Sequence, residues 1–115
     1  MPIPTELRYD RAAHTLHVTF DDNSAAALTA EYLRVESPSA EVQGHGPGQR
    51  IYVGGKQNVG IGRIEPVGHY AVRLVFDDGH DTGIFSWDYL HELGVEYDRR
   101  WAAYLSAISA RGLSR

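Results

Sequence analysis

The chain has 115 residues, a formal net charge of −4 at neutral pH and no cysteine. This length suits one domain with its own core. The lack of cysteine excludes disulfides, thiolate metal sites and a thiol nucleophile, and it fits a reducing compartment. A mildly acidic chain is a poor ligand for nucleic acid, whose phosphates select Lys and Arg. No apolar stretch approaches the roughly 20 residues of a membrane span, and the N-terminus does not resemble a signal peptide. We therefore expect a cytoplasmic domain that binds neither nucleic acid nor membrane.

The first third of the chain alternates apolar and polar residues, which is the period of a strand with one buried face. The pattern predicts three strands joined by tight turns, at residues 7–9, 16–20 and 25–28. Thr29 is a suitable N-cap for a helical turn at 31–34, and Pro38 limits that helix because proline disfavours helical backbone before it.

A glycine-rich segment follows at residues 43–62, with room for one short strand at 50–53. We interpret it as a long loop within the domain, not a linker. Its Gly54-Gly55-Lys56-Gln57 stretch lacks both the upstream glycine and the hydroxyl residue of a phosphate-binding loop. No nucleotide site is predicted there.

Strand alternation returns at 61–67, 70–76 and 82–85, with turns at 68–69 and 77–80. Ser86 is expected to cap a helix that Gly94 ends. A terminal amphipathic helix is predicted over 96–111. Its apolar stripe is either core or a docking face for a partner helix or second copy, and it comprises Tyr97, Trp101, Tyr104, Leu105 and Ile108.

Two stretches of the chain echo each other. Residues 19–34 and 75–91 both read as a strand, an Asp-Asp turn, a strand and then an acidic-Tyr-Leu helix. The alternative is chance, since Asp and Gly populate turns in any case. A true repeat predicts an α+β fold of two β-β-α-like units, whose short antiparallel strands pack in one core beside the C-terminal helix.

The turn Asp77-Asp78-Gly79-His80-Asp81 collects three carboxylates and an imidazole, which are ligands that divalent cations accept. The same residues also suit a polar hairpin turn whose Asp side chains bond their own backbone. Serines lie near a histidine at residues 36–45, but the nucleophile elbow of a serine hydrolase is missing. Serine catalysis is not predicted.

Three stretches resemble the domain found at the N-terminus of gamma-butyrobetaine hydroxylase. They are YLRVESPSAEVQGH at 32–45, EPVGHYAV at 65–72 and FDDGHDTGIFSWDYL at 76–90. The resemblance runs from about residue 5 to residue 94, and residues 95–115 form the terminal helix beyond it. It implies that residues 1–115 are a single domain of this family.

The resemblance implies three settings for such a domain. It precedes the iron- and 2-oxoglutarate-dependent catalytic domain of two hydroxylases, it is appended to some Mrp-type P-loop ATPases linked to Fe–S cluster assembly, and it stands alone in many bacteria. This chain resembles the third kind, since it is too short for the oxygenase domain. The setting implies a non-catalytic binding or adaptor module in iron or Fe–S metabolism, whose partner is such an ATPase or an Fe–S assembly factor. The alternatives are a labile divalent-metal-binding protein and, last, a small enzyme.

The hydroxylase version of the domain binds structural zinc through three cysteines and a histidine. The resemblance places those cysteines at Ser37, Ser39 and Val42, and the histidine at His80. A closed zinc site needs four good ligands, so zinc or iron here would depend on His80 and new neighbours. The candidate binding surface comprises Ser37, Ser39, His45, His69, Asp77, Asp78, His80 and Asp81.

Overall fold

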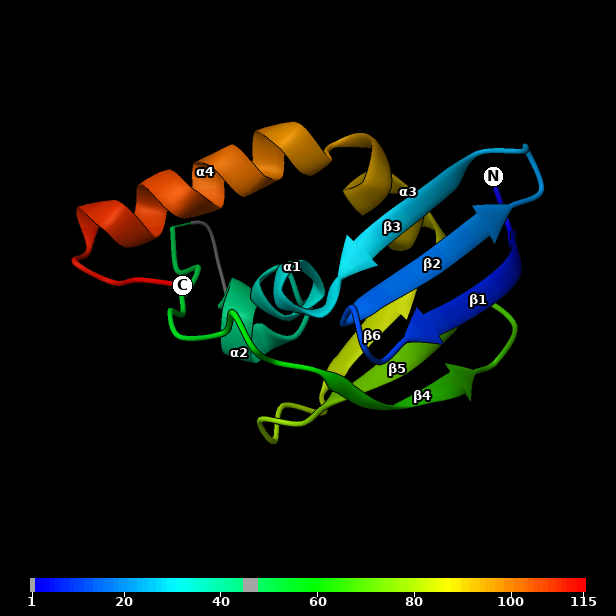
Figure 1. The fold of residues 1–115 in the computed structure, drawn as a ribbon, viewed down its shortest axis with the longest axis horizontal. Helices are drawn as coiled ribbons and strands as arrows, with labels where there is room; N and C mark the ends of the chain where they lie inside the picture. The colour runs from blue at the N-terminus through cyan, green and yellow to red at the C-terminus, as the bar shows by residue number, and fades with distance from the viewer. Residues whose placement is uncertain (1, 45–47) are drawn as a thin grey trace.

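The computed structural model describes residues 2–44 and 48–115 and contains two three-stranded antiparallel sheets and four helices (Figure 1). The sheet orders are β1-β2-β3 and β4-β5-β6, so each sheet is a meander of consecutive strands. The elements in chain order are β1 (Pro4–Asp10), β2 (Thr15–Phe20), β3 (Ala25–Thr29), α1 (Ala30–Val35), α2 (Ala40–Gln43), β4 (Ile61–Val67), β5 (Ala71–Phe76), β6 (Gly83–Ser86), α3 (Trp87–Val95) and α4 (Tyr97–Ala110).

The predicted α+β fold of two similar units is confirmed, with one more strand in each unit than the echo showed. The first unit runs from β1 to α1 and the second from β4 to α3. Both helices begin in the same way. The Thr29 hydroxyl accepts from the Tyr32 amide at 3.1 Å, and the Ser86 hydroxyl accepts from the Tyr89 amide at 3.1 Å. These caps satisfy amides that a helix start leaves without partners.

Two local predictions are wrong. Residues 50–53 form no strand, although Tyr52 and Val53 pack against a small cluster that includes Tyr104. Helix α3 does not end at Gly94 but continues to Val95. A Cβ added at Gly94 would lie 2.8 Å from the Cβ of Ala26, so this glycine serves close packing between α3 and β3.

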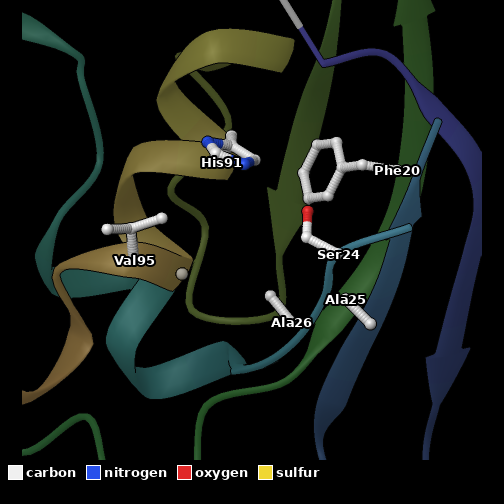
Figure 2. Close-up of a pocket in the computed structure, with 7 residues that line it drawn as sticks. Phe20, Ser24, Ala25, Ala26, His91 and Val95 are labelled. Atoms are coloured by element: carbon white, nitrogen blue, oxygen red, sulfur yellow. The ribbon is translucent and has the colours of Figure 1, made fainter. Parts of the chain in front are cut away.

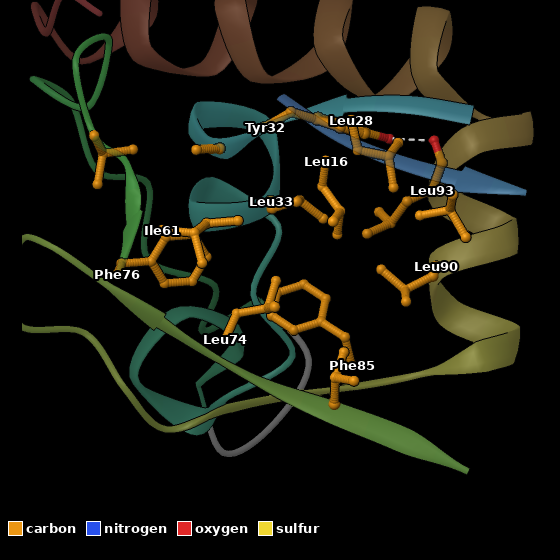
Figure 3. Close-up of a cluster of buried hydrophobic side chains, with 14 of the residues drawn as sticks. Leu16, Leu28, Tyr32, Leu33, Ile61, Leu74, Phe76, Phe85, Leu90 and Leu93 are labelled. Atoms are coloured by element: carbon orange, nitrogen blue, oxygen red, sulfur yellow. Dashed lines mark hydrogen bonds between the residues drawn. The ribbon is translucent and has the colours of Figure 1, made fainter. Parts of the chain in front are cut away.

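One core joins the two units (Figure 3). Leu33 from α1, Leu74 from β5 and Leu90 from α3 are all fully buried there. The helices are also tied reciprocally, because the Tyr32 hydroxyl donates to the Leu93 carbonyl at 2.8 Å and the Tyr89 hydroxyl donates to the Glu36 carbonyl at 2.5 Å. Each acceptor lies four residues after the tyrosine of the other helix.

Helix α4 lies over α1 (Figure 1), and aromatic side chains form the contact between the two helices. The ring of Tyr32 makes edge contacts with Tyr97 at 4.9 Å and with Trp101 at 6.2 Å between centroids. Tyr104 and Ile108 are buried, whereas Leu105 is 37% exposed and lies outside the stripe that packs. The core alternative therefore holds for this helix face. In the described part of the chain, no helix combines the length and apolar character that crossing a bilayer requires.

Candidate functional site

His80 lies in the turn between β5 and β6 and is 5% exposed. The turn itself matches the polar hairpin alternative, because the Asp78 carboxylate accepts from the His80 amide at 3.1 Å and Gly79 adopts a positive φ of 92°. Glycine reaches that left-handed backbone without the strain that a Cβ brings. The turn therefore folds His80 inward and leaves its neighbours outside.

Both nitrogens of the His80 ring have partners. Nε2 lies 2.9 Å from the Ser37 hydroxyl and 3.3 Å from the Ser39 hydroxyl, and Nδ1 lies 3.0 Å from Glu41 Oε2. Burial, with the nearby Arg34 charge, lowers the pKa of His80, so the ring is neutral at pH 7. A neutral imidazole donates from one nitrogen and accepts at the other. Donation from Nδ1 to Glu41 and acceptance at Nε2 from Ser37 satisfies the whole set.

Asp78 ties three segments together beside this cluster. Its Oδ2 lies 2.8 Å from Arg34 Nε of α1 and 2.7 Å from Lys56 Nζ of the glycine-rich segment. Burial alone would raise the pKa of this carboxyl, but the bonds from Lys56, the His80 amide and Arg34 lower it to about 2. Asp78 is therefore charged and fully paired at neutral pH.

The distances among Ser37, His80 and Glu41 resemble those of a nucleophile, its base and an orienting acid. Access decides against catalysis, because Ser37 is fully buried. A Cβ added at Gly83 would overlap the Ser37 hydroxyl, so strand β6 lies directly against it. A substrate carbonyl cannot approach this hydroxyl. These contacts hold the turn, the segment after α1 and helix α2 together, and we call the arrangement the structural lock.

The zinc ligand set of the resembling hydroxylase domain does not fit the residues present here. Val42 has no ligand atom and is 1% exposed, Ser37 and Ser39 offer hydroxyls, and both His80 nitrogens are engaged. Zinc in closed sites selects thiolate and imidazole. Among residues 2–44 and 48–115, no group of three His, Cys, Asp or Glu side chains is placed to hold a metal ion.

The remaining candidate residues make none of the hydrogen bonds or ion pairs found for the His80 side chain within the described part of the chain. His69 is exposed at the turn between β4 and β5, and the six-residue strand β5 separates it from the 77–81 turn by about 20 Å. Asp77 is exposed and donates its amide to the Gly60 carbonyl at 2.9 Å. Asp81 is exposed, 3.7 Å from Arg73. His45 lies outside the described residues.

Sequence reasoning missed three residues of the cluster: Glu41, Arg34 and Lys56. Glu41 lies inside the stretch that carries the family resemblance. Its place next to the serines at the family's zinc-ligand positions could have marked it as a partner of His80. Arg34 and Lys56 lie on a helix and in a loop with no shared spacing. No local pattern could have joined them at Asp78.

An apolar groove lies on the surface where the N-terminal residues meet α3. It has a volume of about 260 Å³, and Ile3 and Tyr70 on its walls are 52% and 61% exposed. The indole of Trp87 is fixed by a 2.7 Å bond from Nε1 to the His69 carbonyl. The lining residues are Pro2, Ile3, Tyr70, Ser86, Trp87 and Asp88.

A smaller pocket of about 140 Å³ lies between the β2–β3 hairpin and α3 (Figure 2). Phe20 and Ser24 face His91 across it, and Val95 stands at its rim. His91 makes an edge contact with the Phe20 ring at 5.0 Å and lies 3.4 Å from the Asp22 carboxylate. This pocket was not predicted from the sequence.

These features define a small α+β domain of two related units. Its cluster of Ser37, His80 and Glu41 is joined by internal hydrogen bonds, and Ser37 and His80 are buried. The family model described as "Gamma-butyrobetaine hydroxylase-like, N-terminal" matches residues 7–91, and the chain belongs to this family. The resemblance drawn from the three sequence stretches is thereby confirmed.

Solved structures show the same fold. Two, each described as an NMR solution structure, are 48% and 46% identical to this chain over its full length, with TM-scores of 0.85 and 0.86, and they are covered to 90% and 86%. A protein of unknown function of the DUF971 family from Acidithiobacillus ferrooxidans is 42% identical, with a TM-score of 0.67, over 79% of this chain and 91% of that one. No curated protein matches.

Proposed function

We propose that the chain is a non-catalytic binding module for a protein partner and that the apolar groove around Trp87 is its contact surface. The observation that carries the proposal is one groove lined by the exposed side chains of Ile3 and Tyr70 and by the half-buried Trp87. Contiguous exposed apolar surface on a small domain is costly in water and typically marks a docking surface. Aromatic anchors of this kind dominate binding energy at protein interfaces.

Hydrogen bonds hold the residues of the groove in place, which favours binding. Trp87 is held by its bond to the His69 carbonyl, and the Trp87 amide donates to the Tyr70 carbonyl at 3.0 Å. Ile3 is held from the other side, because its backbone exchanges two bonds with Asp21 at 3.0 and 2.8 Å. A preorganised surface loses little conformational entropy when a partner docks.

The proposed partner belongs to iron or Fe–S metabolism, an Mrp-type P-loop ATPase or an Fe–S assembly factor. This part of the proposal rests on the resemblance, in which the same domain is appended to such ATPases. The His80 cluster would then serve the module as a structural lock and not as a metal centre.

The test places a photo-crosslinking amino acid at position 70 of the intact chain in its native cell and identifies the captured protein. Ile3→Asp places a charge in the apolar groove and should lower the crosslinked fraction by about tenfold. Ile51→Asp is a matched control, because Ile51 is 51% exposed and lies outside the groove lining. Equal crosslinking by the two variants, or no captured protein, would contradict the proposal. Capture of a protein outside iron or Fe–S metabolism would reject only the named partner class.

A further inference from the structure

The Asp-Asp turn of the first unit and that of the second unit carry residues in corresponding positions. In both Asp-Asp turns, the second aspartate accepts the amide two residues on: Asp22 from Ser24 at 2.9 Å, and Asp78 from His80 at 3.1 Å. Ser24 therefore stands in the first unit where His80 stands in the second. The structure thus contains a counterpart of the His80 cluster.

Each turn pairs with the helix of the other unit. Asp78 bonds Arg34 of α1, two residues after Tyr32, and Asp22 pairs with His91 of α3, two residues after Tyr89. The close approaches also correspond, since Ser37 crowds Gly83 of β6 as Gly94 crowds Ala26 of β3. We call the Arg34–Asp78–His80 side the closed end and the His91–Asp22–Ser24 side the open end.

The two ends differ in what covers them. At the closed end the chain supplies its own cover: Ser39 and Glu41 of the α2 segment bond His80, and Lys56 bonds Asp78. At the open end the chain passes from Gly94 through Glu96 into α4, and a pocket of about 140 Å³ remains (Figure 2). The open end has the same frame without the inserted segment.

We propose that the open end binds a short segment of a partner protein that carries a Lys or Arg for the Asp22 carboxylate and an adjacent aliphatic side chain for the pocket. The proposal rests on the proposed binding role and names the chemistry of the partner segment. The cation would take the place that Lys56 has at Asp78. The aliphatic group would lie between the Phe20 ring and Val95.

Charge complementarity favours a basic occupant. The Asp22 side chain is 43% exposed and has one imidazole, that of His91 at 3.4 Å, within ion-pair distance in the described chain, whereas Asp78 has the permanent charges of Arg34 and Lys56 at 2.8 and 2.7 Å. Hydrogen bonds from Ser24 lower the pKa of Asp22, so the carboxylate is charged at neutral pH. Desolvating it beside an apolar wall requires an opposite charge.

The shape and lining of the pocket favour an aliphatic neighbour to that cation. Its walls carry the Phe20 ring and the methyl group of Ala26, and Val95 at the rim is 73% exposed (Figure 2). A cavity of this size suits one branched aliphatic side chain.

The test is a selection from a displayed random ten-residue peptide library on the immobilised intact chain, followed by titration of the enriched peptides. Enriched peptides should share a Lys or Arg next to Val, Ile or Leu. Their affinity should fall about tenfold for Val95→Lys, which removes apolar surface and repels the peptide cation, and for Asp22→Asn. Two matched controls should leave it unchanged: Leu113→Lys, at a residue 42% exposed, and Asp81→Asn, at a side chain 54% exposed.

Val95→Lys changes an exposed position and should keep the melting temperature, so a loss of binding is not a loss of fold. The proposal is overturned if no peptide family is enriched, if enriched peptides bind Val95→Lys unchanged, or if they are acidic. A failure here leaves the crosslink at position 70 intact, whereas failure of the binding role itself removes both signals.

Discussion

The closed and open ends are built on one frame but use their charges differently. At the closed end, Arg34 and Lys56 neutralise Asp78, whose side chain is 17% exposed. At the open end, Asp22 faces solvent, accepts hydrogen bonds from Ser24, and has His91 as its one ion-pair contact among the described residues. The comparison indicates that the Asp78 turn contributes to stability, whereas the Asp22 turn stays accessible to solvent. Matched substitutions in the two turns measure that division.

The largest difference is expected from the two aspartates. Asp78→Asn removes a charge that two cations share, and Arg34, only 9% exposed, would keep a buried charge without its partner. We expect the free energy of unfolding to fall by about 3 kcal/mol, as for other broken buried ion pairs. Asp22→Asn should leave the free energy of unfolding nearly unchanged, because exposed pairs contribute little. Urea unfolding of both variants measures the gap.

Equal destabilisation by Asp78→Asn and Asp22→Asn would contradict the assignment of structural and accessible ends. Circular dichroism of both folded variants is the control, since an altered native spectrum would change the reference state. A slope of unfolding that is unchanged against urea shows that only stability has moved.

A smaller gap is expected between His80→Ala and Ser24→Ala. Removal of the buried imidazole leaves the Ser37 hydroxyl and Glu41 without their shared partner, and it opens a cavity. An unfolding free energy lower by about 2 to 3 kcal/mol is expected from these two losses. Ser24→Ala should cost under about 1 kcal/mol, since its hydroxyl bonds Asp22 within one exposed turn.

Thermal and urea unfolding of these two variants give the comparison. The His80→Ala chain should also keep the metal content of the parent, measured by elemental analysis of untagged protein. Loss of a stoichiometric metal on this substitution would show that His80 is a ligand and that the lock interpretation is wrong.

Much of the fold could be predicted because its signals are local. Alternation placed β2 and β5, Thr29 and Ser86 gave the helix starts, and the echo gave two units. The candidate site was harder, because Ser37 and His80 stand 43 residues apart and only the family resemblance joined them.

The missed features depend on contacts between the units. Lys56 reaches Asp78 from a segment with no strand or helix period, so sequence spacing carries no trace of that pair. The sequence suggested that Gly94 ends a helix, but this glycine allows α3 to pack closely against Ala26. Only the packed structure distinguishes these two roles. The reciprocal exchange between turns and helices follows from three-dimensional pairing, which the echo alone did not predict.

The smallest and most graded expected effect is a dependence of stability on pH that belongs to the closed end. The pKa of His80 is lowered on folding, so below about pH 6.5 the unfolded chain takes up a proton there that the folded chain resists. Protons then favour unfolding, and stability falls as pH falls through that window. Asp78 adds a second loss, because its pKa is 3.8 when unperturbed and about 2 in the fold.

The Asp78 loss amounts to about 2 kcal/mol and develops between about pH 4 and pH 2. Urea midpoints from pH 8 to pH 2.5 measure both losses. His80→Ala should remove the step near pH 6.5, and Asp78→Asn should remove the acid step. Asp22→Asn should leave the step near pH 6.5 in place, since the group that produces it lies at the other end of the molecule. If the difference curves between the parent and the two closed-end variants were flat across these windows, the closed end would not be the seat of the pH response. The distinction between the two ends would then rest on exposure alone.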